Sequence, residues 1–190
     1  MGLLTSANDI AEAIKDITKA ASDELAGLTR DLYAGRITLP QWEVSAAQTI
    51  KDAHVSFGVL GAGGTDAMTP GLYGKIGGNL ADEYKFLNTF AEKIAAGDMT
   101  EAQATAYIQQ YGGASQQAYW NSIRETAEPV ENNDLPLLTS SPGDGSTQCR
   151  GNCNCQIVVH IDGSADVVLG AGESCPDCIA RAAGGPYRLS

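Results

Sequence analysis

Apolar residues recur every three or four positions along the first part of the chain, which is the spacing of an α-helix. Over residues 8–34 they fall on one stripe, and polar residues occupy most of the positions between them. Gly35 follows and suits a helix end, because glycine readily adopts the left-handed conformation that closes many helices. The stripe consists of Ile10, Ile14, Ile17, Ala21, Leu25, Leu28 and Leu32.

Three further helical stripes follow, and each begins after a threonine that can cap a helix. Thr38 and Thr69 are followed by Pro40 and Pro70, which are favoured in the first turn. Thr100 and Gln103 form a capping-box pattern. The stripes are Trp42, Ala46, Ile50, Ala53, Phe57, Leu60; Leu72, Ile76, Leu80, Tyr84, Leu87, Ile94; and Ala104, Ile108, Tyr111, Ala118, Ile123.

Glycines separate these segments and also interrupt the last one. Residues 61–64 (GAGG) read as a loop, and Gly97 is expected to end the third helix. Gly112 and Gly113 should kink or break the fourth, since each costs about 1 kcal/mol relative to alanine. About four helices joined by short loops predict an antiparallel helical body over residues 1–128.

The pattern changes near Pro129. Residues 129–148 have the composition of a linker or extended arm. Residues 156–161 and 166–169 are β-type runs on either side of Asp162-Gly163, a β-hairpin signal, and residues 179–183 fit one or two helical turns. The sequence therefore predicts a mainly α protein, in which the helical body is followed by a small cysteine-rich β-hairpin module over residues 149–190.

The net charge of the chain limits the classes of partner that it is expected to bind. The chain of 190 residues has 12 Lys and Arg against 23 Asp and Glu, a net charge of −11. Binding to bare DNA or RNA needs clustered basic residues, so direct nucleic-acid binding is not expected and protein partners are favoured. No apolar run approaches the roughly 18 residues of a membrane span, and the start lacks the pattern of a signal peptide.

All five cysteines lie in the C-terminal module, in two clusters on either side of the predicted hairpin. An antiparallel hairpin would bring the clusters together, as in a zinc ribbon, where four thiolates hold a structural Zn²⁺ at about 2.3 Å. The best ligand set is Cys153, Cys155, Cys175 and Cys178, with Cys149 as an alternative ligand for Cys153.

Two other states of the cysteines remain open. An odd number allows at most two disulfides and leaves one thiol over. A reducing cytosol disfavours such bridges, although a particle released from the cell would meet oxidising conditions in which they could form. The third state is a set of thiols that bind nothing.

Other chemistry-bearing residues have ordinary structural interpretations. We expect His54 to be a surface or boundary residue of the second helix, and His160 to lie on a strand surface rather than serve as a spare metal ligand. Asp82 and Glu83 should belong to a solvated helix face. Neither a nucleophile paired with a base nor a metalloenzyme motif is present, so the chain is not expected to be an enzyme and has no candidate catalytic or cofactor-binding residue.

Four phrases of the sequence resemble phage minor head and head-morphogenesis (MuF-like) proteins. They are LYAGRITLPQWE at 32–43, DEYKFLNTFAEKI at 82–94, PGDGSTQCRGNCNC at 142–155 and LGAGESCPDC at 169–178. In that family the Cys-x2-Cys phrase precedes the Cys-x3-Cys-x-Cys phrase, and here the order is reversed. Antiparallel strands joined at either end would keep the same cysteines as neighbours.

The resemblance implies a virion structural or assembly protein of the phage head, present in the host cytoplasm during assembly. It implies docking on capsid or portal protein through the helical body, with self-association as a further partner expectation. The alternative is an intracellular adaptor that uses a zinc-ribbon module to bind a protein. The helical layout and the cysteine spacing leave both readings open.

Overall fold

The computed structural model describes residues 7–126, 134–139, 155–159, 164–169 and 174–189. Over these residues the protein is mainly helical, with a small antiparallel sheet near the C-terminus, so the predicted fold class is confirmed. Helices α1 (Ala7–Tyr33), α2 (Leu39–Ala62), α3 (Pro70–Ala95), α4 (Glu101–Ala114) and α5 (Gln117–Thr126) form the body, with a short 3₁₀ turn, η1 (Thr65–Ala67). None of the described helices has the length and hydropathy to cross a membrane.

The predicted starts of three helices, and the predicted ends of two, are confirmed by the local backbone geometry. The side chains of Thr38, Thr69 and Thr100 each accept a hydrogen bond from a backbone N–H three residues further on. This satisfies a donor that the first helical turn leaves without a partner. Gly35 and Gly97 have φ of 68° and 76°, so both close their helices in the left-handed conformation.

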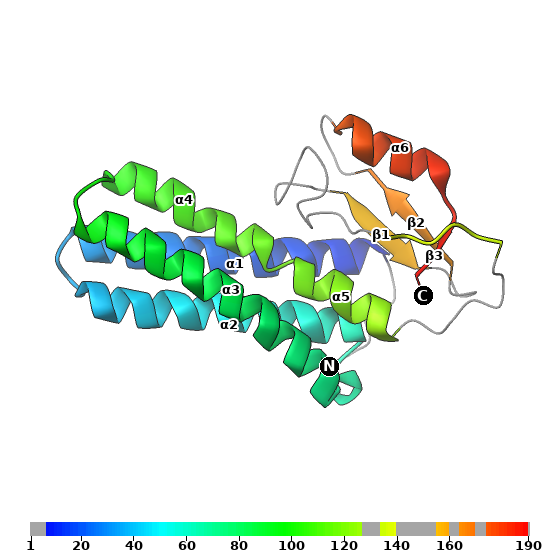
Figure 1. Cartoon of the computed structure of the whole chain (residues 1–190), viewed down its shortest axis with the longest axis horizontal. Coiled ribbons are helices and arrows are strands. Elements are labelled where there is room, and N and C mark those ends of the chain that lie inside the picture. The colour runs from blue at the N-terminus through cyan, green and yellow to red at the C-terminus, as the bar shows by residue number, and fades with distance from the viewer. Residues whose placement is uncertain (1–6, 127–133, 140–154, 160–163, 170–173, 190) are drawn as a thin grey trace.

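Helices α3 and α4 pack against different helices of the body. Helix α2 lies against α1, α4 packs on α1, and α3 and α5 pack on α2 (Figure 1). The core between them contains both tryptophans, as the sequence predicted. Its largest fully buried side chains in the body are Trp42, Trp120, Phe57, Leu25, Ile50, Leu72, Leu87 and Ile108.

The break in the fourth predicted helix lies later than expected. Helix α4 continues through Gly112, and the chain bends at residues 115–116, where Ser115 Oγ donates to Tyr111 O at 2.9 Å. A Cβ on Gly112 would overlap Ser22 Oγ and lie 3.1 Å from Thr18 O, both on α1. The glycine therefore permits close packing of α4 on α1 and does not itself break the helix.

Gly61 has the same function where α2 crosses α5, so the loop expected at residue 61 begins only after Ala62. A Cβ on Gly61 would overlap the backbone oxygen of Tyr119. We expect Gly61→Ala to destabilise the fold by about 1–3 kcal/mol, because a backbone atom cannot move aside cheaply. Urea unfolding of the variant measures the loss.

Gly77→Ala is the matched control for this prediction. Gly77 lies in α3, and nothing is within 4 Å of the position that its Cβ would take. Alanine should stabilise the helix there by about 0.5–1 kcal/mol, since it restricts the unfolded chain. Equal effects of the two substitutions would show that the α2–α5 crossing is looser than described.

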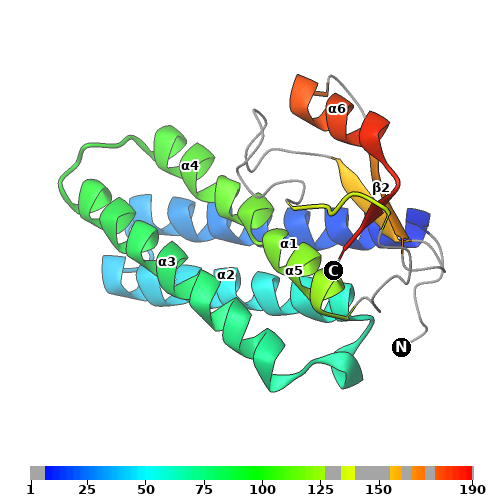
Figure 2. The same cartoon turned by 45° about the vertical axis from the view of Figure 1, so that its right-hand side comes forward.

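The C-terminal module is built on the predicted hairpin. Strands β1 (Gln156–Val159) and β2 (Ser164–Val168) pair antiparallel, and β3 (Tyr187–Arg188) pairs with β2 on its other side. Helix α6 (Pro176–Gly184) begins three residues before the predicted turns and lies over this sheet (Figure 2). Tyr187 fastens it by donating from its hydroxyl to Arg181 O at 2.7 Å.

Part of the segment that we predicted to be a linker, residues 134–139, lies against the sheet. Leu137 forms a parallel bridge with Arg188, and the buried Leu138 donates its N–H to Arg188 O at 2.9 Å. Leu138 O accepts from Arg124 Nη2 of α5 at 3.1 Å. This strand-like piece therefore connects the module to the helical body. The rest of the predicted linker is outside the described residues.

Candidate functional site

Three of the five cysteines lie within the described residues, and they come from both clusters. Cys155 precedes β1, Cys175 caps the N-terminus of α6, and Cys178 lies in the first turn of that helix. Cys155 and Cys178 are buried, and Cys175 is half-buried. Cys149 and Cys153 are outside the described residues.

Each cysteine cluster contributes one buried cysteine to the module, Cys155 beside β1 and Cys178 on α6. Side chains alternate along a strand, so Cys155 shares a sheet face with Ile157, whose Cα partner is Val167. Tyr187 and its partner Ala165 belong to this face, and Tyr187 is hydrogen-bonded to α6. Helix α6 therefore covers the face, with Cys178 as its buried residue.

The predicted zinc ligands cannot be completed from these cysteines alone. Within the described ranges, no group of three or more His, Cys, Asp or Glu side chains is placed to hold a metal ion. The ligand set Cys153, Cys155, Cys175 and Cys178, with Cys149 as the alternative, includes residues outside those ranges. Zinc and disulfides therefore both stay predictions for the module.

Native mass spectrometry with a free-thiol count separates these states. If the module is a zinc ribbon, we expect one Zn²⁺ per chain and loss of order around residues 149–178 when a chelator removes it. A mass lower by two or four hydrogens, with no metal, would instead establish disulfides. Cys178→Ser should abolish zinc binding, whereas His160→Ala should leave it unchanged.

His54 is fully buried, so its expected position at the surface or boundary is wrong. Its Nδ1 lies 3.0 Å from Ile50 O, and its Nε2 lies 3.3 Å from Oε1 of Glu83 on α3. Glu83 is thus turned toward the α2–α3 interface, and only Asp82 of the predicted acidic pair belongs to the solvated face. His160 is outside the described residues.

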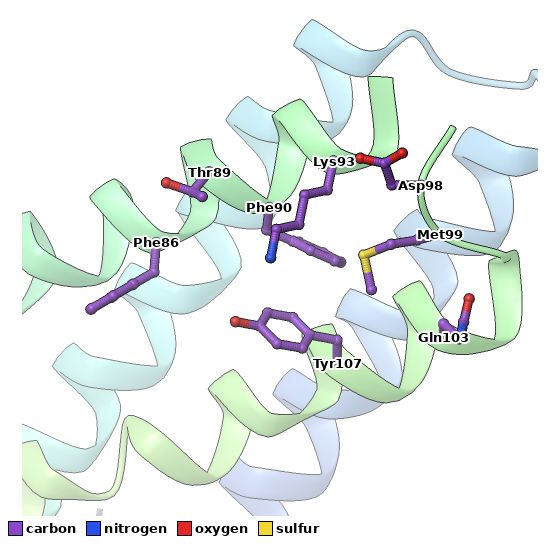
Figure 3. A pocket seen from close by; sticks show the side chains of 8 residues that line it. All are labelled: Phe86, Thr89, Phe90, Lys93, Asp98, Met99, Gln103 and Tyr107. Carbon is purple, nitrogen blue, oxygen red and sulfur yellow. The ribbon is translucent and has the colours of Figure 1, made fainter. Parts of the chain in front are cut away.

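A groove with a volume of about 520 Å³ lies between α3 and α4 of the body (Figure 3). It exists because α3 packs on α2 and α4 packs on α1, so the two helices diverge beside the turn that joins them. We call this the α3–α4 groove. Its lining residues are Phe86, Thr89, Phe90, Lys93, Asp98, Met99, Gln103 and Tyr107.

Aromatic rings form the floor and the mouth of the α3–α4 groove. Phe90 is only 2% exposed, and its ring centre lies 5.6 Å from that of Trp42 and 4.8 Å from that of Tyr107. Phe86 and Tyr107 are 64% and 42% exposed. A buried aromatic base with exposed rings beside it is the composition of a protein-binding surface.

The turn end of the groove is acidic. Among the described residues, Glu92, Asp98 and Glu101 form no ion pair, and Lys93 is the cation beside them. Other charges of α3 are already paired, as Lys75 is with Glu125 and Lys85 with Asp82. Within the described structure, the groove is therefore lined by one carboxylate outside any ion pair, that of Asp98, and those of Glu92 and Glu101 lie at the same turn.

Burial raises the pKa of two tyrosines beside the groove. Burial, with smaller effects from Tyr107 and Glu83, raises the pKa of Tyr111 above its ordinary value. Burial, followed by the charge of Glu101, raises the pKa of Tyr33, whose hydroxyl donates to Met99 O at 2.7 Å. Both hydroxyls therefore stay neutral at physiological pH, and that of Tyr33 anchors the α3–α4 turn to α1.

The apolar pattern of the sequence does not predict this groove. Phe86 lies off the apolar stripe of its helix, and an off-stripe phenylalanine is the local signal that was available. The pattern gives no sign that α3 and α4 diverge, because it treats each helix separately. No protein-family model, curated protein sequence or solved structure matches the chain.

Proposed function

We propose that this chain is a structural or assembly protein of a phage head, and that its helical body docks on capsid or portal protein. The observation that carries the proposal is the open aromatic α3–α4 groove on a helical body. The resemblance of residues 82–94 to minor head proteins supports it, since that phrase contains Phe86 and Phe90.

In this proposal the chain works by binding and has no catalytic step. Phe86, Phe90 and Tyr107 supply the apolar contact, which is the main source of affinity in protein association. The net charge of −11 keeps the chain away from packaged DNA, whose phosphates it would repel. The C-terminal module, held by zinc or by disulfides, would be a second part of the assembly protein.

The test is whether the chain is present in purified phage heads and in assembly intermediates. An epitope-tagged chain, expressed in the host during head assembly, should sediment with heads and should crosslink to capsid or portal protein. Absence from both heads and intermediates would overturn the proposal. Tagging at either end in separate strains controls for interference by the tag.

The second candidate function is an intracellular adaptor with a zinc-ribbon module. The burial of Cys155 and Cys178, one from each cluster, supports it, because a structural zinc needs cysteines from both clusters. One bound zinc in a chain that is missing from heads would favour the adaptor. A chain found in heads would favour the first proposal, whatever the state of its cysteines.

A further inference from the structure

We infer that the α3–α4 groove binds an amphipathic helix of a partner protein, and that this helix carries basic residues beside its apolar stripe. The inference deepens the proposed function and rests on it, because it specifies the chemistry of the docking partner. It adds the position of the interface, the side chains that make it, and the sign of the charge that it selects.

The shape of the site favours a helix as the occupant. The groove runs between two helices of one bundle, and its floor is Phe90, whose ring contacts that of Tyr107. Figure 3 shows Phe86 and Lys93 on the α3 side and Tyr107 on the α4 side. A third helix laid between two others buries residues at i, i+3, i+4 and i+7, and aromatic grooves of this kind recognise such anchors.

The charges favour a basic helix over other helices. Asp98 lines the groove, and Glu92 and Glu101 lie at the same turn between α3 and α4. Since none of the three carboxylates is in an ion pair within the described structure, a Lys or Arg of the partner could pair with them without displacing an existing contact. A second copy of this chain, with its own charge of −11, would be repelled.

The probes for the test are two synthetic helical peptides of about 18 residues, each with the same leucine stripe at i, i+3, i+4 and i+7. One has lysine at its flanking positions and the other has glutamate. We expect the lysine peptide to bind the full chain at least about tenfold more tightly than the glutamate peptide, with affinity falling as salt rises. Fluorescence anisotropy measures both affinities.

Substitutions on the surface of the groove locate the binding. The affinity for the lysine peptide should fall by about tenfold or more in Phe86→Ser and in Asp98→Lys, because the first removes an apolar anchor and the second reverses a charge. Both positions are exposed, so both variants should fold. Val44→Ser is the matched control, since Val44 is an apolar residue of α2 that is 73% exposed and does not line the groove.

Three results of the peptide experiment would overturn the inference. They are no saturable binding of the lysine peptide at about 1 mM, equal affinity for the two peptides, and binding that Phe86→Ser leaves unchanged. Sedimentation that showed a dimer broken by Phe86→Ser would overturn it in favour of a second copy as occupant. A chain that bound the leucine stripe regardless of flanking charge would have an unselective apolar surface, which also contradicts the inference.

Incorporation into heads separates failure of this inference from failure of the proposed function. If the wild type and Val44→Ser are incorporated into heads and Phe86→Ser is not, the result supports both the inference and the proposed function. If the wild type and Phe86→Ser are incorporated equally, the groove is not the docking surface and the head function stands. If the wild type itself is missing from heads, the head function fails and the peptide affinities still decide what the groove binds.

Discussion

Replacing Trp42 by alanine is expected to lower the free energy of unfolding by about 3–5 kcal/mol, the usual cost of removing a fully buried large aromatic side chain. Trp42 is fully buried between α1, α2 and α3. Its ring meets Phe90 edge to face at 5.6 Å, and its Nε1 donates to Thr29 Oγ1 at 3.2 Å. Alanine would leave a cavity and remove both contacts.

Urea unfolding measures this loss, and two further variants show where it comes from. Trp42→Phe keeps most of the apolar contact and removes the donor to Thr29, so its loss should be clearly smaller. Val44→Ala, an exposed change two residues away, should stay within about 0.5 kcal/mol of the wild type. A Trp42→Ala variant as stable as the wild type would contradict the described core.

The same substitution should also affect the α3–α4 groove. Phe90 forms the groove floor, and Trp42 is one of the rings on which it rests. Under conditions in which the Trp42→Ala variant is still folded, it should therefore bind the lysine peptide more weakly than the wild type. The reason is that the floor residue can move into the cavity that the tryptophan leaves. This links the stability of the core to the shape of the docking surface.

Local signals in the sequence are sufficient to predict the helices and the pairing of the first two strands. Each threonine cap and each closing glycine acts through backbone groups within a few residues, so its effect can be predicted without the rest of the fold. The pairing of the two β-type runs is equally local, and the antiparallel partners Ile157 and Val167 confirm it, whereas the predicted turn at Asp162-Gly163 is outside the described residues. The apolar stripe of the second helix also predicted correctly that Trp42 is buried.

Features that depend on contacts between helices were not predicted. Gly61 and Gly112 read as a loop and a break because glycine is a poor helix former, yet both lie in helices at close crossings. The approach of α5 to α2 and of α4 to α1 decides their role, and no local pattern contains that information. The α3–α4 groove has the same origin, because it depends on which neighbour each helix packs against.

The buried position of His54 was missed, although the spacing contained a signal for it. His54 follows Ile50 by four residues and precedes Phe57 by three, so it shares the buried stripe of α2. On α3, Glu83 follows Leu80 by three residues and precedes Leu87 by four, so it shares the buried stripe of that helix. A polar residue on a buried stripe is tolerated when another helix supplies its partner, and the partner could not be identified from either stripe alone.

Replacing Glu83 by alanine is expected to destabilise the protein by about 1–3 kcal/mol, because it removes the only polar group that α3 places against the buried Nε2 of His54 within the described structure. A carbonyl oxygen only accepts, so the proton of His54 Nδ1 is directed to Ile50 O at 3.0 Å. Nε2 then faces Oε1 of Glu83 at 3.3 Å, so this carboxylate is the group that α3 places opposite the buried nitrogen.

Glu83→Gln is the matched variant for this prediction. The glutamine amide can donate to Nε2 of a neutral imidazole while Nδ1 keeps its bond to Ile50 O, so most of the stability should be retained. Urea unfolding of the two variants should therefore rank glutamine well above alanine, and the ¹⁵N shifts of His54 should report the neutral Nδ1–H form in Glu83→Gln. Equal loss in both variants would mean that the carboxylate charge matters more than the hydrogen bond. No loss in either would show that the pair does not hold α3 against α2.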